Sequence, residues 1–164
     1  RYPGVISSHH WGDDGSTERL QALGGLVGPF GSGGPQEWVK ARANRRKDLY
    51  FGFPFASDIN GLAAQPGPTS LATVPEGEEA GPSQVKYPFR SYDGGTVFER
   101  QKAGNRTYDF NVDGVAQYGL YPDFIENLRN TYEQGEAMTA DMFRGAEAYL
   151  QLWERTRAAT AANR

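Results

Sequence analysis

Two adjacent histidines and a later aspartate are the residues of this chain best suited to metal chemistry. His9 and His10 follow the short apolar stretch at residues 4–8, and Asp58 follows the aromatic run at residues 50–55. With no cysteine in the chain, a transition metal would have only His, Asp and Glu as ligands. Zinc binds imidazole and carboxylate groups and activates water, whose proton a nearby carboxylate can accept. His9 and Asp58 therefore form a candidate zinc site, in which Asp58 is also the proton acceptor.

An ordinary turn is the alternative interpretation of the aspartate. Asp58 and Asn60, followed by Gly61, fit an Asx turn that has no catalytic role. Asp113, followed by Gly114, is a second candidate carboxylate to which the same alternative applies. The residue types alone leave both interpretations open.

The two histidines can also be incidental. Neighbouring strand residues point to opposite faces of a sheet, so His9 and His10 cannot easily share one metal if the strand continues through both. Position favours a role for His9. It and Asp58 each follow an expected strand, and the carboxyl ends of parallel strands lie at the same end of a sheet.

The first sixty residues alternate between strand and helix patterns. Apolar and aromatic runs predict strands over residues 4–8, 26–30 and 49–56. Helices are expected between these strands, with Leu20 and Leu23 on the buried face of the first helix. Such alternation favours an α/β fold, in which helices cover a parallel sheet and the active site lies at the carboxyl ends of the strands.

A long excursion interrupts this pattern between residues 62 and 111. Five prolines break any helix there. Residues 85–92 and 96–101 flank Asp93-Gly94-Gly95, which predicts a β-hairpin. Residues 66–83 have few large apolar side chains, which predicts an exposed loop of the length that often acts as a lid.

The end of the chain has helical patterns. Tyr121-Pro122-Asp123 predicts the start of one helix, and Thr139 or Asp141 the start of the last. Apolar residues at helical spacing on the last helix are expected to face the core; they are Met142, Phe143, Ala146, Tyr149, Leu150 and Trp153. The expected organisation is parallel β/α units over 1–61, an insertion over 62–111 and closing helices of the same domain over 112–164.

The sequence totals limit the class of partner. A chain of 164 residues can form one domain with a core. Seventeen basic and twenty acidic residues give a net charge of −3, which makes nucleic acid a poor partner. No apolar run approaches the length that spans a bilayer, so we expect no membrane-spanning segment. A small-molecule substrate is an expected partner.

Three blocks of the sequence carry a resemblance to a known family. Residues 5–10 resemble a strand that ends in a metal-binding His followed by Ser. Residues 51–61 are similar to a Gly-Phe-Gly-x-Asp-Phe-Asp-Gly block, and residues 121–128 and 142–153 resemble a Tyr-Pro-Asp-Leu helix and a terminal helix. In this order, the blocks resemble the membrane (renal) dipeptidases, zinc-dependent TIM (β/α)8 barrels of the amidohydrolase superfamily.

The resemblance implies roles for five residues. His9 takes the place of the metal-binding His, and His10 that of the following Ser. Asp58 is the aspartate that acts at the metal centre, and Asn60 replaces the second aspartate of its block. Arg19 alone stands near the place of the arginine that binds the substrate carboxylate.

The resemblance also implies that this chain is the carboxyl-terminal part of a TIM barrel with an inserted hairpin. The other metal ligands of the family precede the region resembled here, so the remaining ligands of one or two zinc ions would lie outside this chain. A complete barrel of this type has about 250 residues. The expected partner is therefore the missing upstream part of the barrel, in the same polypeptide or as a cleaved chain, and the start at Arg1 without Met fits this expectation.

Three functions are compatible with these features. The first is a metal-dependent hydrolase of an amide or peptide-like bond, dipeptidase-like, in which metal-activated water is the nucleophile. The second is a non-catalytic binding or interaction domain, in which the barrel remnant is a scaffold. The third is a phosphoesterase that uses the same metal chemistry, because ligand types alone do not separate the substrates.

Overall fold

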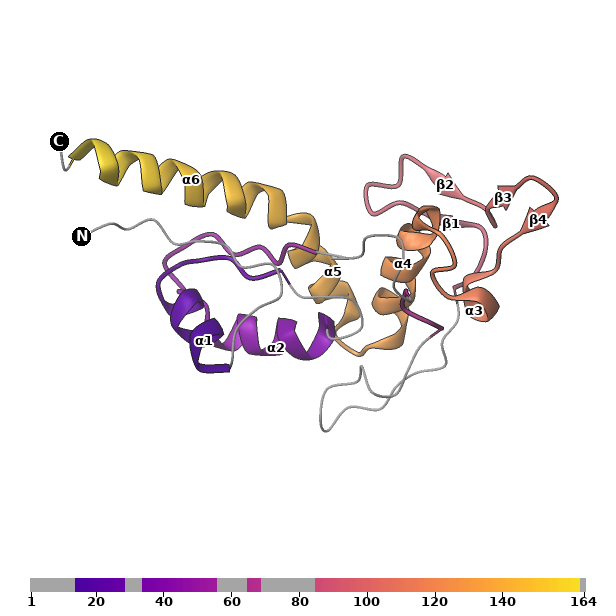
Figure 1. Ribbon diagram of the computed structural model, residues 1–164, viewed down its shortest axis with the longest axis horizontal. Helices are drawn as coiled ribbons and strands as arrows, with labels where there is room; N and C mark the ends of the chain where they lie inside the picture. Colours follow the sequence, from indigo (N-terminus) through magenta and orange to yellow (C-terminus); the bar gives the residue numbers. More distant parts are fainter. Residues whose placement is uncertain (1–13, 29–33, 56–64, 69–84, 163–164) are drawn as a thin grey trace. The chain divides into compact units, whose positions relative to one another are not determined.

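The computed structural model describes residues 14–28, 34–55, 65–68 and 85–162 (Figure 1). Within these ranges the chain combines many helices with a small amount of strand and is broadly α/β. None of the described helices has both the length and the hydropathy needed to cross a bilayer. The chain divides into two compact units: Arg1–Asp58 with Ala137–Arg164 form unit 1, and Ile59–Glu136 forms unit 2. The expected strand over 4–8 and most of the expected loop over 66–83 lie outside the described residues.

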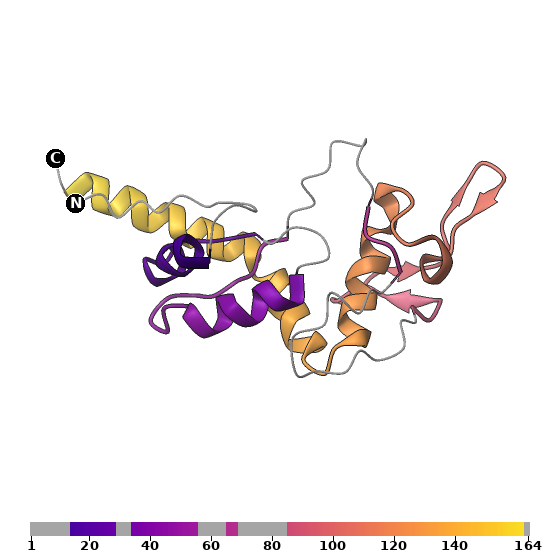
Figure 2. The same ribbon diagram turned by 60° about the horizontal axis from the view of Figure 1, so that its bottom comes forward.

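Unit 1 is helical in its described part. It contains α1 (Asp14–Ala22), α2 (Gly34–Asn44) and α6 (Gly145–Ala162), together with the end of α5 (Gly135–Phe143), which begins in unit 2. Helices α1 and α2 lie next to each other (Figure 2). A cluster of buried apolar side chains, Leu26, Ala148 and Leu152, joins the segment after α1 to α6.

The strand expected over residues 49–56 is wrong for residues 50–55, which belong to no strand. Gly52 and Phe53 are nevertheless buried, as the aromatic run predicted. The backbone N–H of Phe53 donates to the carbonyl of Asp141 at 2.8 Å, so this hydrogen bond goes to helix α5 and not to a neighbouring strand. The expected strand over 26–30 is reduced, in its described part, to an isolated bridge at Val27.

The expected buried faces of the helices are wrong at several positions. Leu23 lies just beyond α1 and is 65% exposed, whereas Gln21 is buried. The last helix is two helices, α5 and α6, and its expected core residues Tyr149, Leu150 and Trp153 are about half-exposed. The buried face of α6 is instead centred on Ala148, whose small side chain permits close packing against Leu26. The helical spacing of the apolar residues was predicted correctly. The buried face was predicted wrongly, because it was assigned to the largest apolar side chains.

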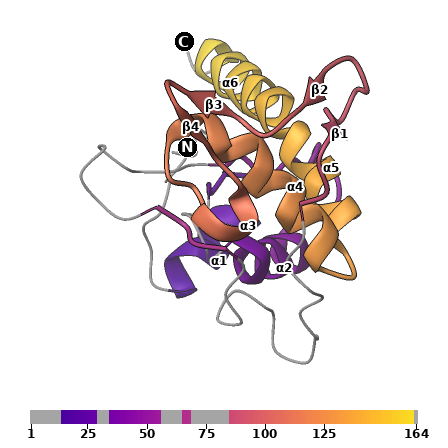
Figure 3. The same cartoon turned by 90° about the vertical axis from the view of Figure 1, so that its right-hand side faces the viewer.

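Unit 2 contains two short β-hairpins (Figure 3). In the first, β1 (Phe89–Arg90) pairs antiparallel with β2 (Val97–Phe98), and this confirms the predicted hairpin. Gly94 turns the chain with φ +74°, in the left-handed region that glycine adopts readily. The second hairpin, β3 (Lys102–Ala103) with β4 (Arg106–Thr107), was not predicted. All the strand pairs of the described residues are antiparallel.

The hairpins are followed by the helical part of unit 2. It consists of α3 (Phe110–Asp113), a 3₁₀ turn over Tyr118–Leu120 and α4 (Tyr121–Thr131). The predicted helix beginning at Tyr121-Pro122-Asp123 is therefore confirmed. Phe110, Leu120, Phe124 and Leu128 are buried and form the centre of this unit.

Candidate functional site

Four of the predicted site residues, His9, His10, Asp58 and Asn60, lie outside the described residues. The fifth, Arg19, lies in the last turn of α1, where its side chain is exposed. In the described part of the chain, no group of three or more His, Cys, Asp or Glu side chains could hold a metal ion.

Asp113, the second candidate carboxylate, has a structural role. Its Oδ1 pairs with the Arg106 guanidinium at 2.8 Å, and its Oδ2 accepts the backbone N–H of Asp109 at 2.9 Å. Asp109 in turn caps α3 by accepting the backbone N–H of Asn111 at 3.0 Å. The Asp109 N–H, followed by Arg106, lowers the pKa of the Asp113 carboxyl group. Asp113 thus holds the ends of α3 together and is not part of a described metal site.

In the described part of unit 1, the carboxylate of Asp141 on α5 accepts hydrogen bonds from three side chains. Its Oδ2 accepts the indole N–H of Trp38 at 3.0 Å and an N–H of Arg42 at 3.3 Å, and its Oδ1 accepts from Arg144 at 3.1 Å. Asp141 is 4% exposed. The two guanidinium groups offset its negative charge. Without them, burial of an unpaired carboxylate would cost stability. The Arg42 guanidinium also lies 5.1 Å from the centre of the Trp38 ring, which joins both donors into one cluster.

The same place anchors the segment that leads into Asp58. The carbonyl of Asp141 accepts the Phe53 N–H. Gly52 lies directly against the backbone of Arg144, where a side chain would overlap the carbonyl oxygen. A side chain on Gly145 would meet the Cα of Pro54 at 2.9 Å. Residues 52–54 are therefore held against the junction of α5 and α6 by backbone contacts that only glycine permits.

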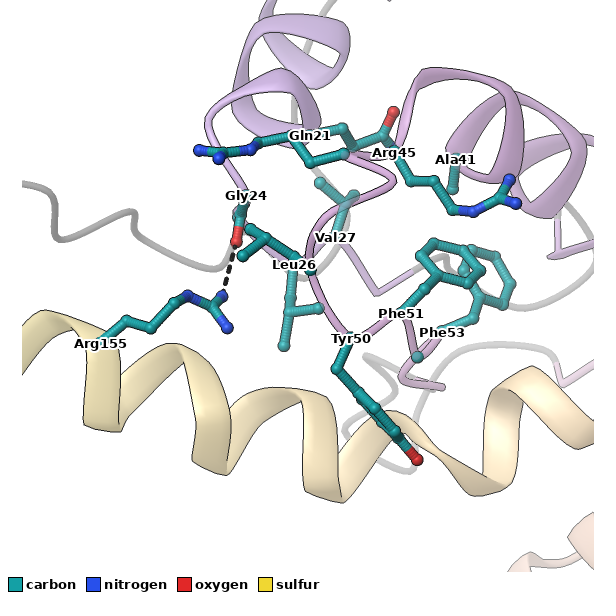
Figure 4. Close-up of a pocket in the computed structure, with 14 residues that line it drawn as sticks. Gln21, Gly24, Leu26, Val27, Ala41, Arg45, Tyr50, Phe51, Phe53 and Arg155 are labelled. Atoms are coloured by element: carbon teal, nitrogen blue, oxygen red, sulfur yellow. Dashed lines mark hydrogen bonds between the residues drawn. The ribbon is translucent and has the colours of Figure 1, made fainter.

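A pocket of unit 1 lies at the other end of this segment (Figure 4). It is lined by the end of α1, by α2, by residues 49–53 and by Arg155, which reaches from α6 to donate to the Gly24 carbonyl at 3.3 Å. The buried Oε1 of Gln21 has no hydrogen-bond partner among the described residues. The cavity volume is about 30 Å³, enough for roughly two water molecules. The pocket therefore fits ordered water, and it lies at the start of the segment that ends near Asp58.

In unit 2, the half-buried Tyr87 forms a polar pair with the buried Asp123. The Tyr87 hydroxyl donates to Asp123 Oδ1 and accepts the backbone N–H of Phe110 at 3.2 Å. Burial raises the pKa of the Asp123 carboxyl group more than this hydrogen bond lowers it, and burial together with Asp123 raises the pKa of Tyr87. Asp123 is 1% exposed, so a substrate has no access to it. The pair joins the first hairpin to α3 and α4 and is best described as structural.

The Asp141 cluster was missed by the sequence analysis, which assigned Asp141 only to a helix start. Trp38 and Arg42 stand four residues apart and therefore share one face of α2. That spacing is a signal that both could share a partner, but nothing local identifies Asp141, which is 103 positions away from Trp38.

Comparisons with known proteins identify no relative of this chain. No family model, curated protein or solved structure matches this chain.

Proposed function

We propose that this chain is the carboxyl-terminal part of a metal-dependent hydrolase of the membrane-dipeptidase type, which cleaves an amide or peptide-like bond. The observation that carries the proposal is the order of the blocks. A histidine after the first apolar stretch, Asp58 after the aromatic run and the helix at Tyr121-Pro122-Asp123 follow one another as in the family that they resemble. The proposed fold is the corresponding part of a TIM barrel, interrupted by the hairpin insertion.

The donors of this chain fit zinc in chemical type. His9 offers an imidazole nitrogen and Asp58 a carboxylate oxygen, both common zinc ligands. Catalytic zinc sites usually have three protein ligands, so two donors call for at least one more from the upstream part of the barrel. When bound, zinc would supply a water of lowered pKa as the nucleophile.

The residues of this chain take separate roles in the proposed hydrolysis. Asp58 removes a proton from water as the water oxygen bonds to the carbonyl carbon. The proton then passes from Asp58 to the amide nitrogen, which leaves when the C–N bond breaks. Arg19, exposed on α1, is proposed to bind a substrate carboxylate. His10 and Asn60, which flank the two metal ligands, are proposed to contact the substrate.

Two features of the structure support the proposal. Residues 52–54 are fixed against the junction of α5 and α6, so the chain approaches Asp58 from a rigid point. A metal ligand needs such support, because the geometry of a metal site depends on how firmly its ligands are held. Helix α4 also begins at Tyr121, where the resemblance expects a helix, and α6 covers most of the expected terminal helix.

Metal content tests the proposal. We would purify the complete polypeptide that carries this sequence, with anything that co-purifies, and measure zinc by elemental analysis and composition by intact mass. The wild-type protein should hold one or two equivalents of zinc and hydrolyse dipeptides. His9→Ala and Asp58→Asn should lose zinc, and Asp58→Asn should lower turnover about 100-fold or more while the fold remains intact.

A matched control is Asp48→Asn. Asp48 is an exposed aspartate of unit 1 that pairs with Arg46, and its substitution should change neither zinc content nor turnover. Near-normal turnover and zinc content in folded Asp58→Asn would refute the hydrolase. A folded protein without metal would instead favour the binding domain, and hydrolysis of phosphate esters but not dipeptides would favour the phosphoesterase.

A further inference from the structure

We infer that unit 2 contains a binding site for a neutral sugar, in an open pocket between residues 65–67 and the segment that leads into α4. The pocket has a volume of about 370 Å³, and the described residues that line it are 65–67, 113 and 115–118. This volume lies within the range of small-ligand sites. The inference is independent of the proposed hydrolase, because these lining residues all belong to unit 2 and none is part of the candidate metal site.

Backbone contacts within unit 2 fix the walls of the pocket. The Val115 N–H donates to the Pro66 carbonyl at 2.8 Å, which joins the two lining segments. Gly114 has φ +59°, and a Cβ on it would meet the Cα of Gly67 at 2.7 Å, so the segments approach as closely as glycine permits. A ligand therefore meets a preformed site, and less of the binding free energy is lost in ordering the protein.

Three side chains supply the polar groups of the pocket. Gln65 accepts a hydrogen bond from the Tyr121 hydroxyl through Oε1, and its Nε2 donates to no described residue. Gln117 Nε2 donates to Gln101 at 3.0 Å, which uses one of its two N–H groups. Each oxygen of the Asp113 carboxylate accepts one hydrogen bond and keeps a further lone pair. The pocket therefore offers both N–H donors and carboxylate acceptors to a ligand.

The charge of the pocket favours a neutral ligand. Asp113 is the only charged side chain among the described residues that line it, and the Arg106 guanidinium pairs with this carboxylate at 2.8 Å. An anionic ligand would find no unpaired cation among these residues, and a cationic ligand would compete with Arg106. A hydroxyl group both donates and accepts. Neighbouring hydroxyl groups of one ligand can therefore use the amide donors and the carboxylate acceptors together.

Tyr118 adds an aromatic surface to the same pocket. It is 52% exposed, although its ring stacks on that of Tyr121 with 6.1 Å between the ring centres. An exposed aromatic ring beside hydrogen-bonding groups suits a ligand that has both an apolar face and polar edges. A pyranose ring has this combination, with C–H groups on its face and hydroxyl groups at its edge. A sugar is therefore the ligand class that uses the aromatic ring and the polar groups at once.

Saturation-transfer NMR on the complete polypeptide tests the inference. The probes are the α- and β-methyl glycosides of glucose, galactose, mannose and N-acetylglucosamine. At least one glycoside should bind with a dissociation constant of roughly 1–10 mM, the affinity expected of a small ligand in an open pocket. If none of these glycosides binds, the inference is overturned.

Variants of the lining residues locate the bound glycoside. Tyr118→Ala and Gln65→Leu should each weaken binding about 10-fold, because the first removes the stacking surface and the second an N–H donor. Tyr118→Phe keeps the ring and should bind like wild type. The matched control is Tyr92→Ala, since Tyr92 is 49% exposed on the first hairpin and does not line the pocket. Circular dichroism establishes that each variant is folded.

The comparison of these variants has a clear negative result. If folded Tyr118→Ala and Gln65→Leu bind the glycoside as tightly as wild type does, the sugar binds elsewhere and the assigned site is wrong. Equal losses in Tyr118→Ala and Tyr92→Ala would also contradict it, because the effect would then not be specific to the pocket.

Discussion

Asp123 is a carboxyl group whose burial disfavours its charged form. Its pKa is raised chiefly by burial, although the Tyr87 hydroxyl donates to it and acts in the opposite direction. A folded-state pKa above the unfolded value means that the folded state binds the proton more tightly. The stability that this residue contributes is therefore full below the ordinary carboxyl pKa and is lost as the pH rises through the raised value.

Asp123→Asn should make this visible as a pH dependence. The variant lacks the titration, so its free energy of unfolding relative to wild type should improve as the pH rises from about 4 to about 7. Urea unfolding followed by circular dichroism at several pH values would measure the difference. Asp93→Asn is a control of opposite sign, because the Ser91 hydroxyl and the Gly95 N–H lower the pKa of Asp93. The stability of Asp93→Asn relative to wild type should instead worsen as the pH rises through the lowered pKa of Asp93 to about 5, and a curve parallel to that of Asp123→Asn would contradict the assignment.

At the scale of elements, the junction of α5 and α6 depends on the absence of side chains. Gly52 lies against the Arg144 carbonyl, which belongs to the backbone and cannot move aside without disturbing both helices. A Cβ added to Gly95, on the exposed turn of the first hairpin, would first meet the Asp93 side chain, at 3.4 Å. The two glycines therefore offer matched sites for the same substitution.

Gly52→Ala should destabilise unit 1 by roughly 1–3 kcal/mol, the usual cost of overpacking, whereas Gly95→Ala should change stability by less than about 0.5 kcal/mol. Tryptophan fluorescence during urea unfolding is a suitable measurement, because Trp11, Trp38 and Trp153 all belong to unit 1. Equal midpoints for Gly52→Ala and wild type would show that the junction tolerates a side chain.

The elements that the sequence predicted correctly are those with local signals. The first hairpin follows from Asp93-Gly94-Gly95, and α4 follows from Pro122 and Asp123 in its first turn. The second hairpin has a Gly104-Asn105 turn, a signal of the same kind that was overlooked. These elements need no information from distant parts of the chain.

The errors come from partners that are distant in sequence. An aromatic run such as residues 50–55 has the composition of a central strand, but the Phe53 N–H donates to Asp141 on α5, a residue that follows unit 2 in the sequence. The Asp141 cluster has the same origin, since Trp38 and Asp141 show no mutual signal in the sequence. For the candidate site, the sequence could propose ligand types, and it could not identify the group that anchors their approach.

At the scale of the whole molecule, unit 2 is an insertion in the chain of unit 1. The chain leaves unit 1 after Asp58 and returns at Ala137. The Phe53 to Asp141 hydrogen bond brings the two flanking segments together within unit 1. A short bridge should therefore be able to replace the whole of unit 2.

Replacing Ile59–Glu136 by about eight Gly and Ser residues should leave unit 1 folded, since such a linker reaches about 26 Å when extended. The cut removes only the first two residues of α5. Helical circular dichroism and a cooperative transition in tryptophan fluorescence would be the expected result. If the product is unfolded with Gly/Ser linkers of two different lengths, unit 1 depends on unit 2 for its stability.

The division of unit 1 into two separate stretches of chain also sets an order of events during translation. Unit 2 is continuous in sequence, so it can fold as soon as Ile59–Glu136 has left the ribosome. Unit 1 must wait for Ala137–Arg164, because Asp141 and Ala148 supply its anchor and part of its core. Until then the buried aromatic segment before Asp58 has no partner from α5 or α6. A nascent chain in which Ile59–Glu136 has left the ribosome and Ala137–Arg164 has not should therefore bind chaperones through that segment, although its second unit can already fold.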